Sequence, residues 1–188
     1  MQFRALPSFA GLLGLALMLF CAVPASAQLF ETKASQAFMI DADTGTVLFS
    51  KDADKPIPPA SMAKLMTMEV VFNALKAKRM TLDDTFVVSE NAWRTGGAPS
   101  GTSTMFAKLK SAVRVEDLIQ GVTVQAANDG CIVFAEGMAG SEANFAAQMT
   151  ERARELGLAK STFVNSTGLP ADGQQTTVRE LTMLALHL

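Results

Sequence analysis

The stretch that decides the fold reads Pro58-Pro59-Ala60-Ser61-Met62-Ala63-Lys64-Leu65-Met66-Thr67. Two prolines favour an extended approach, and serine is a favoured residue at the start of a helix, so we expect a helix to begin near Ser61. Three residues are almost one helical turn, so the Lys64 amine would then lie beside the Ser61 hydroxyl. We therefore predict a helix over residues 61–78 with both side chains in its first turn.

Lys64 is the one charged residue between Ala60 and Thr67, where most of its neighbours are apolar. A lysine among apolar side chains loses hydration, so its pKa falls and it can be a neutral amine near neutral pH. A neutral amine against a hydroxyl is a general base for a serine nucleophile, and no histidine is needed. The spacing thus predicts Ser61 as a nucleophile and Lys64 as its base.

The N-terminus has the composition of a secretory signal. Arg4 is the only charged residue in residues 1–30, residues 9–23 are continuously apolar, and residues 25–27 read Ala-Ser-Ala. We predict export with removal of residues 1–27, which leaves residues 28–188. A retained transmembrane anchor is the alternative, for which this apolar run is short.

Charge and composition exclude several classes of protein. Removal of residues 1–27 would take the formal net charge from −2 to −3, which suggests neither nucleic acid nor an anionic membrane as a partner. The single histidine, His187, lies one residue from the end and is interpreted as incidental, so no Ser-His-Asp triad, metal site or other cofactor is expected. Cys131 has no cysteine partner in residues 28–188, and its apolar neighbours favour an inert buried thiol.

Hydrophobic patterning outlines one domain of short strands and helices. A β-hairpin is expected from strands 36–40 and 46–49 around a turn at 41–45, and another strand at 86–88. Helices are expected at 61–78, where the broad apolar surface indicates a buried helix, and at 115–124, 129–137, 142–156 and 176–188. Residues 94–104 are rich in glycine, serine and threonine, and predict a loop of the kind that often carries function.

Taken together, these segments resemble the D-alanyl-D-alanine carboxypeptidases, the low-molecular-weight type of the serine penicillin-binding-protein superfamily. The matching segments follow the family order and are residues 40–45, 59–67, 89–92, 121–129 and 163–170. The resemblance implies an α+β architecture, the penicillin-binding-protein/β-lactamase-like transpeptidase fold, in which a helical lobe packs on an antiparallel sheet. The active site of that fold lies where the lobe meets the sheet.

Such enzymes use three elements, Ser-x-x-Lys, Ser-x-Asn and Lys-Thr-Gly. Ser61 and Lys64 match the first. The second departs from the pattern, because 65 positions after Ser61 the chain reads Ala126-Ala127-Asn128. By resemblance Asn128 binds the substrate peptide, whereas the serine hydroxyl that helps to relay protons is missing at Ala126. Either a water replaces this hydroxyl or turnover is slow.

The third element is absent, and two other matches do not replace the missing motifs. Ser89-Glu90-Asn91 fits Ser-x-Asn as text but lies only 28 positions after Ser61, and Arg94-Thr95-Gly96 comes before residue 126, in the wrong order. We therefore expect the chain to be C-terminally incomplete, with the late strands of the sheet missing. Such a piece would expose a strand edge and lack one oxyanion-hole donor, worth ~10²–10³ in rate, so we expect it to be inactive alone.

The resemblance implies an exported serine-type D-Ala-D-Ala carboxypeptidase that removes the terminal D-alanine of peptidoglycan stem peptides through an acyl-enzyme on Ser61. It implies β-lactams as inhibitors, a periplasmic or cell-envelope location, and membrane association through a C-terminal region. One alternative is a non-catalytic penicillin-binding-like module that recognises the cell wall. A β-lactamase is disfavoured because the chain has no tyrosine and no Glu-x-x-Leu-Asn segment. A generic helical binding domain is the remaining alternative.

Overall fold

The computed structural model describes residues 31–188. The chain divides into two units, one ending at Lys33 and a compact one formed by Ala34–Leu188. The predicted signal sequence, residues 1–27, lies outside the described residues, and its assignment stays a prediction. Among residues 31–188, no helix is both long and apolar enough to cross a membrane.

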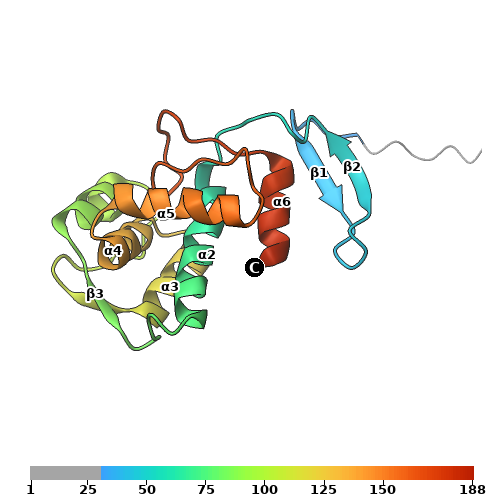
Figure 1. Ribbon diagram of the computed structural model, residues 1–188. Coiled ribbons are helices and arrows are strands. Elements are labelled where there is room, and N and C mark those ends of the chain that lie inside the picture. The colour runs from blue at the N-terminus through green and yellow to red at the C-terminus, as the bar shows by residue number, and fades with distance from the viewer. Residues whose placement is uncertain (1–30) are drawn as a thin grey trace, which may run out of the picture. The chain divides into compact units, whose positions relative to one another are not determined.

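The unit Ala34–Leu188 is an α+β fold with two small antiparallel sheets (Figure 1). Its strands are β1 (Ala37–Ile40), β2 (Val47–Lys51), β3 (Thr85–Val87) and β4 (Ala112–Arg114). Its helices are α2 (Ala63–Lys76), α3 (Val115–Gln125), α4 (Asn128–Ala139), α5 (Glu142–Glu155) and α6 (Val178–His187). Three short helical turns complete it: η2 (Ala60–Met62), η3 (Ala92–Gly96) and η4 (Ala98–Ser100).

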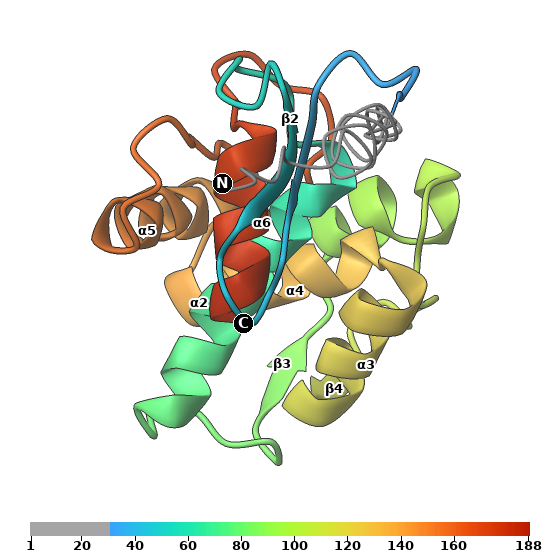
Figure 2. The same ribbon diagram turned by 90° about the vertical axis from the view of Figure 1, so that its right-hand side faces the viewer.

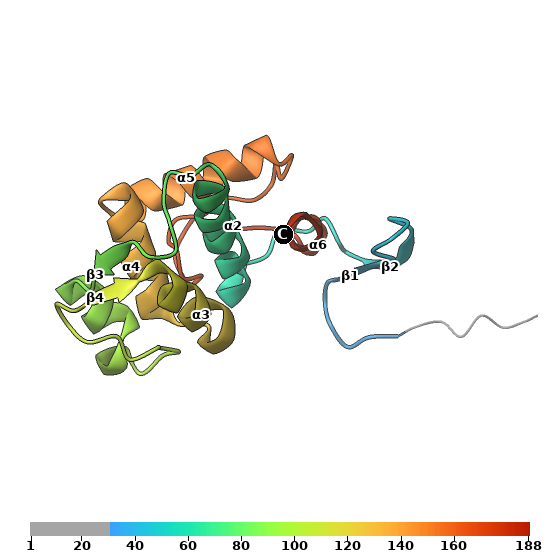
Figure 3. The same ribbon diagram turned by 90° about the horizontal axis from the view of Figure 1, so that it is seen from below.

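Strands β1 and β2 form the expected hairpin. The Asp41 Oδ1 atom accepts hydrogen bonds from the Thr44 backbone N–H at 2.8 Å and from the Thr44 hydroxyl at 2.7 Å, which closes the turn. Gly45 follows with a φ of +70°, a left-handed conformation that glycine adopts without strain. The hairpin packs on α6, where the Arg179 guanidinium carbon lies 4.3 Å from the centre of the Phe38 ring. Helix α6 thus lies between the hairpin and α2 (Figures 2 and 3).

Strand β4 is absent from the sequence-based expectations. It is only 3 residues long, too short for a periodicity to stand out, and it exists because it pairs with β3, where Val113 lies opposite Phe86. The expected loop at 94–104 also contains more local structure than predicted, since it begins inside the π-helical turn η3 and includes η4.

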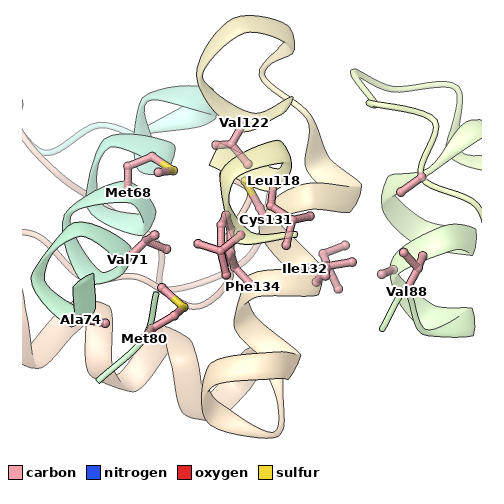
Figure 4. Packing of buried hydrophobic residues seen from close by; sticks show 14 residues of the cluster. Met68, Val71, Ala74, Met80, Val88, Leu118, Val122, Cys131, Ile132 and Phe134 are labelled. Carbon is pink, nitrogen blue, oxygen red and sulfur yellow. The ribbon is translucent and has the colours of Figure 1, made fainter. Parts of the chain in front are cut away.

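Helix α2 is the buried helix that the sequence predicts, and hydrophobic clusters pack on two of its sides. One cluster joins it to α3 and α4 around the fully buried Phe134, as Figure 4 shows. The Phe134 ring meets Phe86 of β3 edge to face, with ring centres 6.2 Å apart. The second cluster joins α2 to α5 and α6, with the buried Phe145 and Leu184 among its members. These two clusters fix the helix that follows Ser61.

The predicted bounds of this helix were wrong at both ends. Residues 60–62 form the 3₁₀ turn η2, α2 starts at Ala63, and the Ser61 hydroxyl caps no helix. At the other end α2 stops at Lys76, because Lys78 adopts a left-handed φ of 55° that a right-handed helix cannot continue. The early 3₁₀ turn leaves the Ser61 hydroxyl free for other contacts.

The core around Phe134 yields a stability prediction. Phe134→Ala should lower the free energy of unfolding by about 3–5 kcal/mol, because it removes a large buried ring and leaves a cavity. Phe72→Ala is the matched control, since Phe72 lies on α2 with 38% of its surface exposed, and its loss should be much smaller. Chemical denaturation of the intact protein measures both, and equal losses would contradict the central place of Phe134.

Candidate active site

Ser61 lies in the turn η2 at the rim of a pocket. The residue before it, Ala60, has a left-handed φ of 49°, a strained conformation of the kind that clusters at functional sites in proteins. The pocket has a volume of about 450 Å³ and a largely apolar wall. It is lined by Ser61, Met62, Lys64, Leu65, Met68, Val122, Thr123 and Ala126. Ser61 is itself exposed, so its hydroxyl is accessible to a ligand.

Lys64 lies in the first turn of α2, only 6% exposed. Its Nζ atom lies 3.5 Å from Ser61 Oγ and donates a hydrogen bond of 2.7 Å to the Thr167 carbonyl oxygen. The prediction that the amine lies beside the hydroxyl is therefore confirmed. The separation from Ser61 is long for a hydrogen bond, as is common for catalytic pairs without substrate.

Burial lowers the pKa of Lys64 below its ordinary value of 10.5. A negative charge on the nearby Cys131 would oppose this shift, but burial also raises the pKa of the Cys131 thiol to about 12, so that group is neutral at neutral pH. Cys131 is fully buried, which confirms the prediction of an inert thiol. Desolvation therefore favours the neutral amine at Lys64.

A neutral lysine amine has two N–H groups and one lone pair. The Thr167 carbonyl can only accept, so it takes one N–H of Lys64 and restricts the rotation of the amine. The lone pair is then available to the Ser61 hydroxyl proton. This geometry would allow Lys64 to act as a general base toward Ser61.

The loop that supplies the Thr167 carbonyl is a part of the site that the residue chemistry alone did not identify. The Thr67 hydroxyl donates to the Ser166 carbonyl at 2.6 Å, one turn along α2 from Lys64. Gly168 has a φ of +82°, and a Cβ atom there would lie 1.8 Å from the Ala60 carbonyl oxygen. Only glycine fits against the turn that carries Ser61. The signal for this loop in the sequence is its place in the segment 163–170 of the family resemblance.

The same loop is fastened to α5. Glu142 Oε1 accepts hydrogen bonds from the Ser166 hydroxyl at 2.7 Å and from the Ser166 backbone N–H at 3.0 Å. The Asn165 Oδ1 atom accepts from the Gly168 N–H at 2.8 Å, which closes the turn from within. These bonds hold the Thr167 carbonyl in place for Lys64.

Asn128 begins α4 and is 3% exposed. Its Nδ2 group donates to the Thr102 hydroxyl oxygen at 2.9 Å, while its Oδ1 atom is buried and has no partner among the described residues. Ala126, two positions earlier, ends α3 with a left-handed φ of 51° and lines the pocket with Ser61 and Lys64. The pocket wall at this position is thus a methyl group.

Asp129 is a second buried polar residue at the start of α4, and no pattern in the sequence indicates its role. Its carboxylate accepts hydrogen bonds from the Thr104 hydroxyl at 2.7 Å and from the Met105 and Ala107 N–H groups, each at 3.0 Å. Between these two anchored groups Phe106 has a left-handed φ of 59°. Asp129 therefore fixes the loop before α3 to the helix that starts with Asn128.

The two segments that only resemble the missing motifs, residues 89–91 and 94–96, do not line the pocket, and their side chains make other contacts. The Ser89 hydroxyl accepts from the Ala92 N–H at 2.9 Å, and Asn91 donates to Glu136 Oε1 at 2.9 Å. Arg94 forms an exposed ion pair with Glu90. Their exclusion from the site on grounds of order and spacing agrees with these contacts.

Among the described residues, no three histidine, cysteine, aspartate or glutamate side chains gather as metal ligands would. His187, interpreted from the sequence as incidental, has a specific contact. Its Nε2 atom lies 3.3 Å from Glu69 Oε1, a buried carboxylate of α2 that also receives Arg152 at 2.7 Å. The histidine therefore joins α6 to the helix that follows Ser61.

The close approach of Gly168 to Ala60 yields a second prediction. Gly173→Ala, at a φ of +84° where the added Cβ would meet only Val164 Cγ1 at an unstrained 3.9 Å, should destabilise through the backbone conformation alone, by about 1–2 kcal/mol. Gly168→Ala has the same conformational cost, and its Cβ would in addition collide with the Ala60 carbonyl oxygen. We therefore expect Gly168→Ala to lower the free energy of unfolding by clearly more than Gly173→Ala. Chemical denaturation of both variants decides, and equal losses would show that the loop and the turn can separate freely.

Comparison with known proteins places these residues in a family context. A model of the D-alanyl-D-alanine carboxypeptidase family matches residues 22–188. The chain is 42% identical over 151 residues to the D-alanyl-D-alanine carboxypeptidase DacC of Escherichia coli, covering 80% of this chain and 38% of the relative. It is 33% identical over 156 residues to DacF of Bacillus subtilis, covering 83% of this chain and 39% of that relative. The chain therefore spans about two fifths of the length of these relatives.

Solved structures give the same result for the fold. Penicillin binding protein 6B from Escherichia coli superposes with a TM-score of 0.79 at 34% identity, covering 87% of this chain and 52% of that one. The expected fold class, a penicillin-binding-protein transpeptidase fold with a helical lobe, is confirmed by this similarity. The antiparallel sheets of this chain are the hairpin of β1 and β2, which packs on α6, and the pair of β3 and β4.

Proposed function

Because the chain belongs to the D-alanyl-D-alanine carboxypeptidase family, we propose that it supplies the nucleophile and base of a serine-type D-Ala-D-Ala carboxypeptidase. The observation that carries the proposal is the Lys64 amine, 6% exposed and 3.5 Å from the accessible Ser61 hydroxyl. A buried amine with a lowered pKa beside an accessible serine is one of the arrangements that activate a hydroxyl for nucleophilic attack.

The reaction would proceed through an ester on Ser61. The Oγ atom attacks the carbonyl carbon of the bond between two D-alanines while Lys64 Nζ accepts the hydroxyl proton. Collapse of the tetrahedral intermediate breaks the C–N bond, and the departing D-alanine amine takes a proton from the Lys64 ammonium. A water then hydrolyses the ester by the same proton transfers in reverse order.

Asn128, two positions after Ala126 of the pocket wall, and residues of the pocket itself would bind the substrate. The Asn128 Oδ1 atom is buried and has no partner among residues 31–188, so it is suited to accept an N–H of the peptide. The apolar side chains of Met62, Leu65 and Met68 would exclude water from the ester. The methyl group of Ala126 contributes no proton relay, so an ordered water would have to pass the proton from the Lys64 ammonium to the leaving amine.

The proposed substrates are peptidoglycan stem peptides, and the proposed inhibitors are β-lactams, whose amide resembles the D-Ala-D-Ala bond. Supporting this, the structural relative named above carries penicillin binding in its name. An exported enzyme of the periplasm or cell envelope fits the predicted signal at residues 1–27. No cofactor is needed for these steps.

Covalent labelling tests the nucleophile. A labelled penicillin should form a stable adduct with the intact protein and none with Ser61→Ala, because the Ser61 hydroxyl is accessible and has the Lys64 amine beside it. Ser89→Ala is the control, since that hydroxyl accepts from the Ala92 N–H and should not affect labelling. An adduct that survives Ser61→Ala would show that the nucleophile is wrongly assigned. Labelling without release of D-alanine from any stem peptide would favour the non-catalytic cell-wall module.

The pH dependence of acylation tests the base. Only the neutral form of Lys64 can accept the proton, so the acylation rate should fall as the pH drops through the lysine pKa, which burial has lowered from 10.5. Lys64→Arg puts a permanent cation in place of the amine and should lose about 10²–10⁴ in rate above the lysine pKa, because an arginine stays protonated. This difference should shrink at lower pH, where the wild-type lysine is protonated as well. Stopped-flow acylation measures both effects. A profile unchanged between wild type and Lys64→Arg would exclude Lys64 as the base.

A further inference from the structure

We propose that Thr102 is a positioning residue for the substrate-binding amide of Asn128, an inference that rests on the proposed function. The two side chains come from different elements, the segment after η4 and the first residue of α4. They meet in a hydrogen bond of 2.9 Å from Asn128 Nδ2 to Thr102 Oγ1. Because Thr102 contacts the amide itself, we take its hydroxyl to act through Asn128.

The direction of this hydrogen bond follows from the groups behind Thr102. The Ser100 hydroxyl donates its single proton to the Gly97 carbonyl oxygen at 2.7 Å, and a carbonyl can only accept. The Ser100 and Thr102 hydroxyl oxygens lie 2.8 Å apart, so the proton between them must come from Thr102. Ser100 Oγ also accepts the Thr102 backbone N–H at 3.2 Å, which uses its second lone pair.

With its proton committed to Ser100, the Thr102 oxygen can only accept from Asn128. The NH₂ end of the carboxamide must therefore face Thr102, and the Oδ1 end must face away from it. In the opposite orientation two oxygens would face each other without a proton between them, which is repulsive. The chain of donors thus selects one of the two amide orientations of Asn128.

The selected orientation leaves Oδ1 buried and without a partner among the described residues. A buried acceptor in this state costs stability unless a ligand supplies a donor, and a peptide N–H is such a donor. The surrounding loop is held rigidly, because the Asn128 backbone N–H donates to the Ser103 carbonyl at 2.8 Å and Asp129 anchors the residues that follow. Thr102 therefore prepares Asn128 to receive the substrate.

The test compares Thr102→Val, which keeps the shape but loses the acceptor, with Thr102→Ser, which keeps the hydroxyl. In the intact protein Thr102→Val should lower kcat/KM for a D-Ala-D-Ala peptide about 10-fold, the worth of one hydrogen bond. Thr102→Ser should restore most of the rate. In an Asn128→Ala background Thr102→Val should have no further effect, because Thr102 acts through the amide.

Two kinetic outcomes would overturn the inference and leave the proposed function intact. The kcat/KM of Thr102→Val could equal that of wild type. Alternatively, Thr102→Val could lower kcat/KM by the same factor in the wild-type and the Asn128→Ala backgrounds, which would indicate a general role in loop folding. If the wild type neither releases D-alanine nor binds penicillin, the proposed function fails instead. In that case nuclear magnetic resonance of the Asn128 NH₂ protons tests the hydrogen bond to Thr102 independently of activity. The resonances are identified by their loss in Asn128→Asp. Thr102→Val should shift one of the two proton resonances upfield, and Thr102→Ser should not.

Discussion

The site depends on one contact between segments that are 103 positions apart, the hydrogen bond of 2.7 Å from Lys64 Nζ to the Thr167 carbonyl oxygen. A lysine removed from water needs a polar partner, and a charged partner would have raised its pKa. A neutral carbonyl satisfies one N–H without stabilising the charged form as strongly as a carboxylate would. The contact therefore reconciles burial of the Lys64 amine with the role of base that we propose for it.

Contacts elsewhere in the structure hold Lys64 and Thr167 in position for this hydrogen bond. The loop with Thr167 lies so close beneath the turn of Ser61 that Gly168 has no room for a side chain. Glu142 of α5 holds the loop from one side, and the Thr67 hydroxyl of α2 holds it from the other. Because α2 packs into two hydrophobic clusters, neither end of the contact can move independently of the core.

The parts of this arrangement that are local in sequence are also the parts that the sequence predicts. Spacing alone brings Ser61 and Lys64 together, because one helical turn decides it, and the hairpin follows from strand alternation around Asp41 and Gly45. Contacts between segments far apart in the chain produce no comparable spacing or alternation in the sequence. The roles of Thr167 and Asp129 depend on a backbone carbonyl and on N–H groups, which every residue possesses, and Asn128 was found only through the family resemblance.

The buried state of Cys131 has a practical consequence for probing this protein. It is the only cysteine in residues 31–188, fully enclosed, with the pKa of its thiol raised to about 12. Maleimides and iodoacetamides react with exposed thiolates, so this thiol will stay silent in the folded state. A cysteine introduced at an exposed position such as Thr123, on the pocket rim, can then carry a fluorophore or spin label without removal of the native one. Reaction of Cys131 itself would report that the core between α2 and α4 has opened.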